Sequence, residues 1–279
     1  MKHQTNIKVV RSGDRLEIIK FKKAITYGEP PACVSKSSSF REKNKEEKLF
    51  IRYASSRRSK QTFTRLVYSN TYQWRSIKGR FIKPTLLTLT FKDNIKKVKQ
   101  ANDEFTKFVK RLNYEITGRK MSFLKYITAI EFQKRGAVHY HVLFFNYSYL
   151  PKKILTAIWR QGHIKVERIK DRDMRKATNY LCKYMTKNLE NKKLCGQKSY
   201  FGSRGLKKPI VTRNQERNNS LLEIYGDSLE SAEEFRKTYQ SEYCGEFDYS
   251  IYDLHKNKEL RKGVLAFESL FSYNNEPNK

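Results

Sequence analysis

The spacing of apolar residues along the chain predicts a central block of alternating strands and helices. Residues 83–91 form a β-rich run, and residues 93–118 carry apolar side chains at helical spacing and end in a glycine. Residues 125–145 hold two apolar runs of strand composition, separated by a polar break. A second helical pattern covers residues 151–162, opening with a proline, and residues 163–169 alternate as a strand.

This order of elements, β-α-β-β-α-β, is typical of the split βαβ arrangement found in RRM and ferredoxin-like domains. The predicted fold class is therefore α+β, with an antiparallel sheet and helices on one of its faces. The other face of the sheet is expected to stay free, and it is the face on which a functional site can be built.

The flanking segments divide the chain into three expected parts. Residues 1–80 combine a hairpin, a linker rich in proline and serine, and a basic helix. Residues 81–209 form the core domain, which includes a third helix over about 172–190. Residues 210–279 form a C-terminal extension.

Within the two flanking parts, the pattern predicts four local elements and one disordered tail. The hairpin covers residues 1–28, and the basic helix runs from about residue 46 to 72. In the C-terminal extension we expect a short helix near 229–239 and a strand near 247–254. The tail after Asn274 is expected to be disordered.

The hairpin within residues 125–145 is predicted to bring three metal-binding side chains together. If residues 134–136 are a three-residue loop whose glycine is left-handed, Glu131 lies opposite His139. His141 then points to the same face, because side chains alternate along a strand. Cross-strand partners lie about 5 Å apart at Cβ, so all three side chains can reach one ion.

Two neutral imidazoles and one carboxylate leave several coordination positions open, which suits a catalytic divalent metal. The alternative is that His139 and His141 are ordinary strand residues on a solvated face. The register of Glu131 and the apolar residues 142–145 beside the motif favour the metal site.

The third predicted helix carries two tyrosines and two lysines at helical spacing. Tyr180 and Tyr184 are four residues apart, as are Lys183 and Lys187, so each pair shares a helix face. A phenol with a pKa near 10 is a poor nucleophile at neutral pH, but a lysine and a metal-bound phosphate favour its ionised form. The alternative is a surface helix in which one tyrosine packs and the lysines are solvated.

The net charge of +31 and the pI near 9.9 exceed what solubility requires, and they indicate a polyanionic partner, most often nucleic acid. Aromatic residues make up 13%, and a basic protein rich in tyrosine can stack unpaired bases. Basic side chains concentrate in the predicted helix at 46–72 and in a glycine-punctuated loop at 198–209. The candidates for DNA binding are Arg57, Arg58, Arg65, Arg204, Lys207 and Lys208, although such side chains are often merely solvated.

A membrane partner is not favoured, because no apolar run approaches the length of a spanning helix and no signal peptide opens the sequence. Four scattered cysteines without a C-x-x-C pair suggest reduced thiols and argue against a zinc finger. We therefore expect a cytoplasmic protein.

Three motifs occur in a characteristic order: the Thr-Leu-Thr-Phe strand at residues 88–91, the apolar-flanked His139-Tyr140-His141, and the tandem Tyr-x-x-Lys at residues 180–187. Together they resemble rolling-circle replication initiators (Rep proteins) of the HUH endonuclease superfamily. The chain looks like the bacterial plasmid, integrative-element and phage branch, which is related to the filamentous-phage gene II protein. The resemblance covers about Lys83 to Pro209.

The resemblance implies roles for the candidate residues. His139 and His141 would bind Mg²⁺ or Mn²⁺, and Glu131 matches the acidic or polar third ligand. Tyr180 and Tyr184 match the nucleophile positions of members with two tyrosines, which form a 5′-phosphotyrosine link and release a 3′-hydroxyl.

The motif lysines, Lys183 and Lys187, match side chains that help to hold the phosphate or the metal-bound state. Two tyrosines would permit a second strand transfer without release of the first strand. The division of labour between Tyr180 and Tyr184 stays open.

The implied function is a metal-dependent, site-specific DNA nickase and strand transferase that starts rolling-circle replication. Its partners would be origin DNA, presented as a single strand or hairpin, together with a host helicase and a DNA polymerase, since no G-x-x-x-x-G-K-[ST] helicase motif occurs. The tyrosines follow the H-x-H motif, which distinguishes this type from relaxases. The alternatives are a transposase with the same chemistry and a non-catalytic nucleic-acid-binding module of the same topology.

Overall fold

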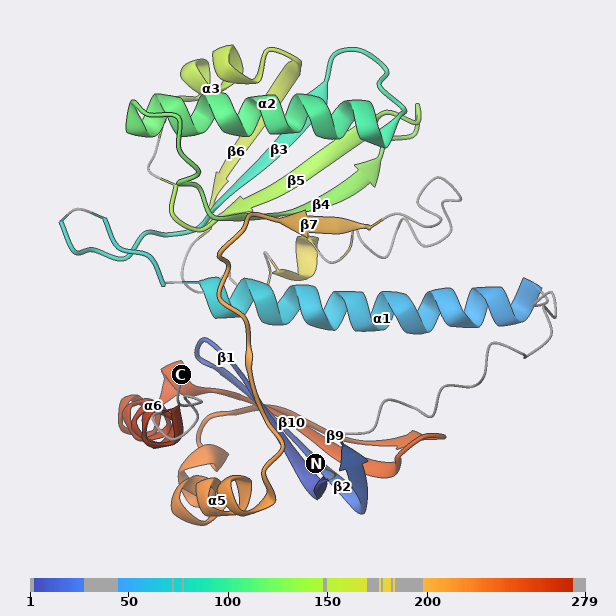
Figure 1. The fold of residues 1–279 in the computed structure, drawn as a ribbon, viewed down its shortest axis with the longest axis vertical. Helices are drawn as coiled ribbons and strands as arrows, with labels where there is room; N and C mark the ends of the chain where they lie inside the picture. Colours follow the sequence, from blue (N-terminus) through green and yellow to red (C-terminus); the bar gives the residue numbers. More distant parts are fainter. Residues whose placement is uncertain are drawn as a thin grey trace, which may run out of the picture. The chain divides into compact units, whose positions relative to one another are not determined.

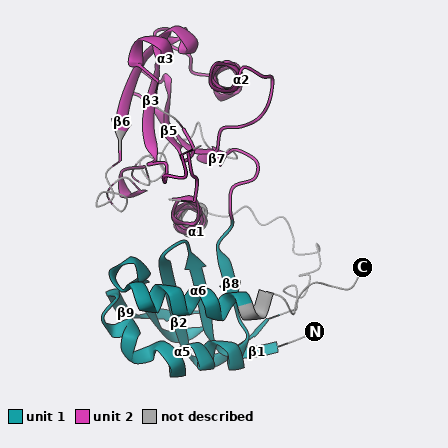
Figure 2. Ribbon diagram, turned by 90° about the vertical axis from the view of Figure 1, so that its left-hand side faces the viewer, with its two compact units in different colours: residues 1–42, 208–279 teal, residues 43–207 magenta. Residues whose placement is uncertain are grey.

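A computed structural model of the 279-residue chain describes residues 3–27, 45–71, 73–76, 78–147, 150–169, 176, 178–181, 183 and 198–272. The chain divides into two compact units, of which unit 1 comprises residues 1–42 and 208–279 and unit 2 comprises residues 43–207 (Figure 2). Each unit contains one five-stranded antiparallel sheet. The α+β fold class expected from the sequence is confirmed.

This division differs from the three consecutive parts expected from the sequence. The N-terminal hairpin and the C-terminal extension are not separate appendages but pair in one sheet, and the basic helix belongs to unit 2. Composition alone does not reveal this, because the pairing joins segments more than 200 residues apart, as in the pairing of Val9 with Thr212.

The sheet of unit 2 has the strand order β6-β3-β5-β4-β7 (Figure 1). Its first four strands are the segments that the apolar pattern predicted, and β7 adds a short fifth strand at the edge. The bounds are β3, Thr85–Phe91; β4, Tyr126–Phe132; β5, Val138–Phe144; β6, Gly162–Arg168; and β7, Tyr200–Gly202. With its two helices the order is β3-α2-β4-β5-α3-β6, which is the predicted split βαβ arrangement.

Helices α2 (Val98–Thr117) and α3 (Lys152–Trp159) pack on one face of this sheet and enclose its larger core. Phe105 and Phe108 of α2 and Trp159 of α3 are almost wholly buried there. This apolar burial is the main driving force for the arrangement of the layer.

The helix ends differ in detail from the expected signals. Helix α2 begins after the N-cap Lys97, which makes no side-chain hydrogen bond, rather than at residue 93, and it ends at the left-handed Gly118, the glycine expected at its end. Helix α3 ends at the left-handed Arg160 rather than at Gly162. Gly162 begins β6 instead, where its φ of 147° and close approach to backbone atoms of β3 leave no room for a Cβ atom.

The opposite face of the sheet is not free, contrary to the expectation from the sequence. Helix α1 (Lys45–Asn70) packs there through Phe63 and Val67, and Leu181 joins the same apolar cluster. The expected basic helix at 46–72 is therefore confirmed as a helix, but its apolar side chains Phe63 and Val67 cover part of the sheet.

The sheet of unit 1 has the order β8-β1-β2-β10-β9, and two helices pack on it (Figure 1). The predicted hairpin at 1–28 is present, with a tight turn at Gly13 and Asp14. The bounds are β1, His3–Ser12; β2, Arg15–Tyr27; β8, Ile210–Thr212; α5, Gln215–Glu230; β9, Glu233–Ser241; β10, Gly245–Asp253; a 3-10 turn, Leu254–Lys256; and α6, Lys258–Ser272.

The C-terminal extension contains a strand where a helix was expected. The short helix near 229–239 is wrong, because α5 ends at Glu230 and strand β9 follows, paired along its length with β10. The strand near 247–254 is confirmed as β10. The expected linker at 29–44 and the tail after Asn274 lie outside the described residues.

Candidate metal centre and nucleophile helix

The β4–β5 hairpin has the register that the sequence predicted. Gly136 is left-handed with a φ of 84°, its amide donates to the carbonyl of Gln133, and the Gln133 amide donates to the carbonyl of Ala137. This three-residue loop places Glu131 directly opposite His139. The register depends on glycine, because a side chain at this φ is disfavoured.

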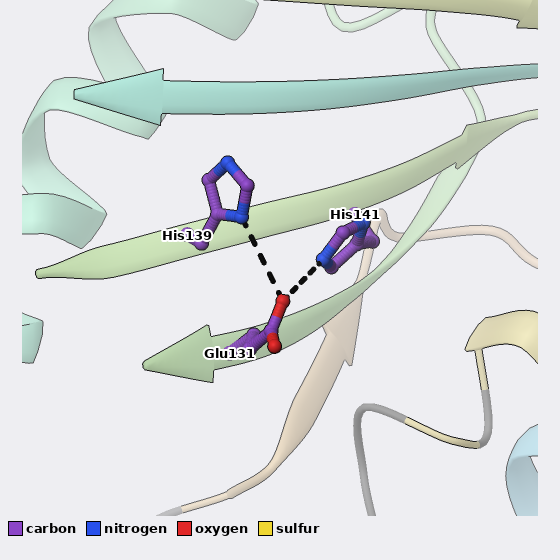
Figure 3. Close-up of side chains that lie close together, drawn as sticks. All are labelled: Glu131, His139 and His141. Atoms are coloured by element: carbon purple, nitrogen blue, oxygen red, sulfur yellow. Dashed lines mark hydrogen bonds and ion pairs between the residues drawn. The ribbon is translucent and has the colours of Figure 1, made fainter. Parts of the chain in front are cut away.

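Glu131, His139 and His141 form a compact triad on the α1 face of the sheet (Figure 3). One carboxylate oxygen of Glu131, Oε2, lies 2.9 Å from Nε2 of His141 and 3.7 Å from Nδ1 of His139. The potential ligand atoms all lie within 4.8 Å of one another. A single divalent ion can therefore take a ligand atom from each residue.

Two threonines of the neighbouring strand β3 form hydrogen bonds with the ring nitrogens that do not face Glu131. The Thr88 hydroxyl is 3.3 Å from Nδ1 of His141, and the Thr90 hydroxyl is hydrogen-bonded to Nε2 of His139. In each ring the other nitrogen faces Glu131. Such outer hydrogen bonds fix the orientation of a metal-binding imidazole and select its tautomer.

The surroundings of the triad favour the neutral form of the His141 imidazole. Its side chain is 2% exposed, and burial lowers its pKa, although the hydrogen bond to Glu131 acts in the opposite direction. A neutral imidazole offers a lone pair to a metal, whereas a protonated one does not. Glu131 is also buried, so its charge lies in a site that a cation would stabilise.

Tyr180 lies beside the triad. Its ring stands perpendicular to that of His141, with 5.8 Å between the ring centroids, and its side chain is partly exposed. The nearby Thr178 and Leu181 are buried, so this short helical segment is held against the sheet while its tyrosine remains accessible. Lys183, in the same segment, is exposed. Tyr184 and Lys187 lie outside the described residues.

The edge strand β6 adds charged side chains that the sequence reasoning did not select. Lys165 pairs in register with Thr88, and Glu167 pairs with Leu86, so both point to the face that carries the triad. Their ion pair and the nearby Tyr180 raise the pKa of Lys165. The strand alternation of residues 163–169 contained this signal, because alternate residues in it share a face.

His163 is a strand residue of β6, as predicted. It lies opposite Thr90, but its ring is exposed and is 3.5 Å from the amine of Lys152. Among the described residues, the group that can hold a metal consists of the three predicted ligands and does not include His163.

The candidate DNA-binding residues of α1 lie on its exposed side. Arg57 and Arg58 are exposed and Arg65 is half-buried, whereas Phe63 and Val67 of the same helix face the sheet. Near the end of α1, Asn70 binds the backbone of Lys207 through two hydrogen bonds of 2.9 Å.

This contact ties the basic loop at 203–208 to α1, and the Lys207 amine also donates to Gln73. Arg204, Lys207 and Lys208 are exposed in this loop. The arrangement fixes the loop backbone while leaving its charged side chains at the surface.

The fold and the triad define an α+β protein with an HUH-like core. Residues 84–189 match the model of the replication-associated protein family of the ORF2 and gene II protein type, which confirms for this segment the resemblance to rolling-circle replication initiators. That family is described as replication-associated. Comparisons with curated proteins and with solved structures gave no match. None of the described helices is long and apolar enough to cross a membrane.

Proposed function

We propose that this protein is a metal-dependent, site-specific DNA nickase and strand transferase that initiates rolling-circle replication. The observation that carries the proposal is the position of Tyr180 beside His141, which is one of the three residues of the candidate metal site. The replication-associated family and the net charge of +31 support DNA as the substrate.

The donor set fits a hard divalent cation with open positions, such as Mg²⁺ or Mn²⁺. Glu131 supplies an anionic oxygen, and His139 and His141 supply two neutral nitrogens. When bound, the ion would polarise the scissile phosphate and offset the negative charge that develops on it. Thr88 and Thr90 hold the imidazoles, so the ligands are oriented before the substrate arrives.

In the proposed reaction the phenol oxygen of Tyr180 attacks the scissile phosphorus and loses its proton. A tyrosine–phosphate bond forms as the bond from phosphorus to the 3′-oxygen breaks, and that oxygen leaves as a 3′-hydroxyl after taking up a proton. The 5′ end stays linked to the protein, and the 3′-hydroxyl becomes a primer for a host polymerase. A host helicase would supply unwinding.

The reverse attack by a 3′-hydroxyl on the phosphotyrosine bond gives strand transfer. Tyr184 is proposed as a second nucleophile, and Lys183 and Lys187 are proposed to neutralise the phosphate. The side chains proposed to contact the DNA backbone are Arg57, Arg58, Arg65, Arg204, Lys207 and Lys208.

The deciding experiment is incubation with a labelled single-stranded library and Mn²⁺, followed by sequencing of the DNA in covalent adducts. We expect adducts at one sequence, none after chelation of the metal, and none with the variant Tyr180→Phe/Tyr184→Phe. His139→Ala should abolish nicking but keep salt-sensitive DNA binding. The control His163→Ala changes an exposed histidine of the same face and should keep nicking. Adducts that persist in the double phenylalanine variant would refute the tyrosine assignment.

A further inference from the structure

One face of the unit 1 sheet carries aromatic side chains that do not belong to the hydrophobic core of the unit. Helices α5 and α6 pack on one face, where Leu16, Ile18 and Tyr252 are buried. The opposite face carries a set of rings that we call the aromatic face. Its members are Phe21, Phe235, Tyr239, Phe247 and Tyr249.

The strand register places these five side chains on one side of the sheet. Phe247 of β10 pairs with Phe21 of β2 and with Tyr239 of β9, which forms a row of three rings across three strands. Tyr249 and Phe235 follow on the same side, because residues two apart on a strand share a face. Leu16 and Ile18, which alternate with this set, point to the helices instead.

The rings form a continuous series of contacts. Tyr239 stacks on Phe247 with 5.6 Å between ring centroids and an interplanar angle of 22°, and the ring centroids of Phe21 and Phe247 are 5.9 Å apart. Tyr249 lies 6.3 Å from Tyr239 and 6.2 Å from Phe235. All five rings are half-buried rather than buried, so each presents part of its surface.

The charged groups of this face are mainly basic. The Lys237 amine lies 5.6 Å from the Tyr239 ring centroid, and Lys8 pairs in register with Ile19 on the same face. The carboxylate of Glu17 is buried, is paired with Arg15 and accepts a hydrogen bond from the Tyr249 hydroxyl.

The nearby acidic residues alternate to the other side of the sheet. Glu246 and Asp248 lie within 4.0 Å of the Lys22 amine there. A set of partly exposed π-faces beside cations is complementary to unpaired bases on a phosphate backbone.

We propose that the aromatic face binds single-stranded DNA by stacking bases on Tyr239 and Phe247, with Lys237 directed to the phosphates. This activity goes beyond nicking: it gives the protein a second contact with an unwound strand, in a unit that lacks the metal triad. The binding is independent of sequence, because every base has a π-face.

The competing interpretation is that the rings only stabilise the sheet, since cross-strand aromatic pairs do this without any ligand. The two interpretations differ in their consequences. Stacking on DNA requires planar aromatic surfaces, whereas a leucine, although smaller, still supplies apolar contacts within the sheet. Tyr239→Leu/Phe247→Leu therefore separates them.

The test uses the full chain with Tyr180→Phe and with metal chelated, so that nicking does not contribute. Binding to a labelled thymine oligonucleotide is measured by fluorescence anisotropy, with circular dichroism as the check of folding. We expect Tyr239→Leu/Phe247→Leu to weaken binding by about 5- to 100-fold. The control Tyr243→Leu changes a ring that is 95% exposed outside the aromatic face and should leave binding unchanged. Unchanged binding in the double variant, or an equal loss in the control, overturns the proposal.

A second measurement does not require a variant that folds. Irradiation of the native chain with an oligonucleotide containing bromouracil should crosslink peptides within residues 233–253, which mass spectrometry identifies. Crosslinks confined to residues 43–207 would overturn the proposal. Lys237→Gln should reduce the salt dependence of binding, whereas Lys262→Gln, on α6, should not. Nicking activity is measured separately, so failure of stacking leaves the nickase proposal standing, and the reverse also holds.

Discussion

The rings of His141 and Tyr180 meet edge to face, with centroids 5.8 Å apart and planes at 90°. The histidine comes from a buried central strand, and the tyrosine comes from a helical segment about 40 residues later in the chain. An imidazole of the candidate metal site and the phenol of the proposed nucleophile are thus brought together by the fold rather than by sequence proximity.

Tyr180 is expected to make the first covalent bond to DNA. Tyr180→Phe removes the attacking oxygen but keeps the ring against His141, so metal affinity should stay unchanged while adduct formation is lost. Mass spectrometry of the DNA-linked peptide from the native chain checks the assignment. An adduct found on another tyrosine alone would contradict it.

The threonines behind the imidazoles are expected to control metal affinity. Thr88→Val and Thr90→Val keep the shape of the side chain but remove the hydroxyl bound to each histidine, and each change should weaken Mn²⁺ binding by about 10- to 100-fold. Isothermal titration calorimetry measures this. Thr156→Val, at an exposed position of α3, is the control and should bind as the native chain does. Equal affinities in all these chains would show that the hydroxyls do not orient the ligands.

Gly162 is expected to be indispensable for the stability of unit 2. A Cβ atom there would lie 2.5 Å from the backbone oxygen of Thr90 and 2.5 Å from the backbone nitrogen of Lys92, neither of which can move without disturbing the sheet. Gly162→Ala should therefore lower the denaturation midpoint, followed by the fluorescence of the adjacent buried Trp159.

The matched control for Gly162→Ala is Gly226→Ala, in α5. No atom lies within 4 Å of the added Cβ, and alanine is the better helix former by about 0.5–1 kcal/mol. This change should not lower the stability of the chain. A loss of stability equal to that of Gly162→Ala would show that backbone crowding is not the cause.

Tyr249 is expected to give unit 1 a characteristic response to alkaline pH. Burial, and then the nearby carboxylate of Glu17, raises the pKa of its phenol to about 12. Because the unfolded value is near 10, the neutral phenol contributes stability that is fully present below about pH 10 and is lost as the pH rises towards about 12. Tyr249→Phe should flatten this part of the stability profile, measured by urea denaturation across that pH range. A profile as steep as that of the native chain would contradict this.

The sequence was sufficient to predict the features that depend on local pattern. The period of two on each side of Gly136 determined the register of Glu131 and His139, and the order of apolar runs determined the split βαβ sheet. The same periodicity shows that Lys165 and Glu167 share one face of their strand. It does not show that this strand pairs with β3, which places that face beside the triad.

The features that were missed depend on pairing between distant segments. The helix expected near 229–239 is strand β9, since its alternation is stabilised by β10 and through it by β2 of the N-terminal hairpin. Likewise, Phe63 and Val67 are the only buried apolar side chains within residues 55–70 of this basic helix, which is a weak local signal. Tertiary context outweighs intrinsic propensity in such segments.

The insertion of unit 2 between the two parts of unit 1 has a consequence for how the protein is made. On the ribosome, β1 and β2 emerge before unit 2, yet the strand that pairs with the edge of β2 is β10, more than 200 residues later. The β2 edge of the β1–β2 hairpin therefore stays unpaired until β10 has been synthesised, after unit 2. Anything that halts translation before β10 would release a chain with a finished triad and an incomplete first sheet.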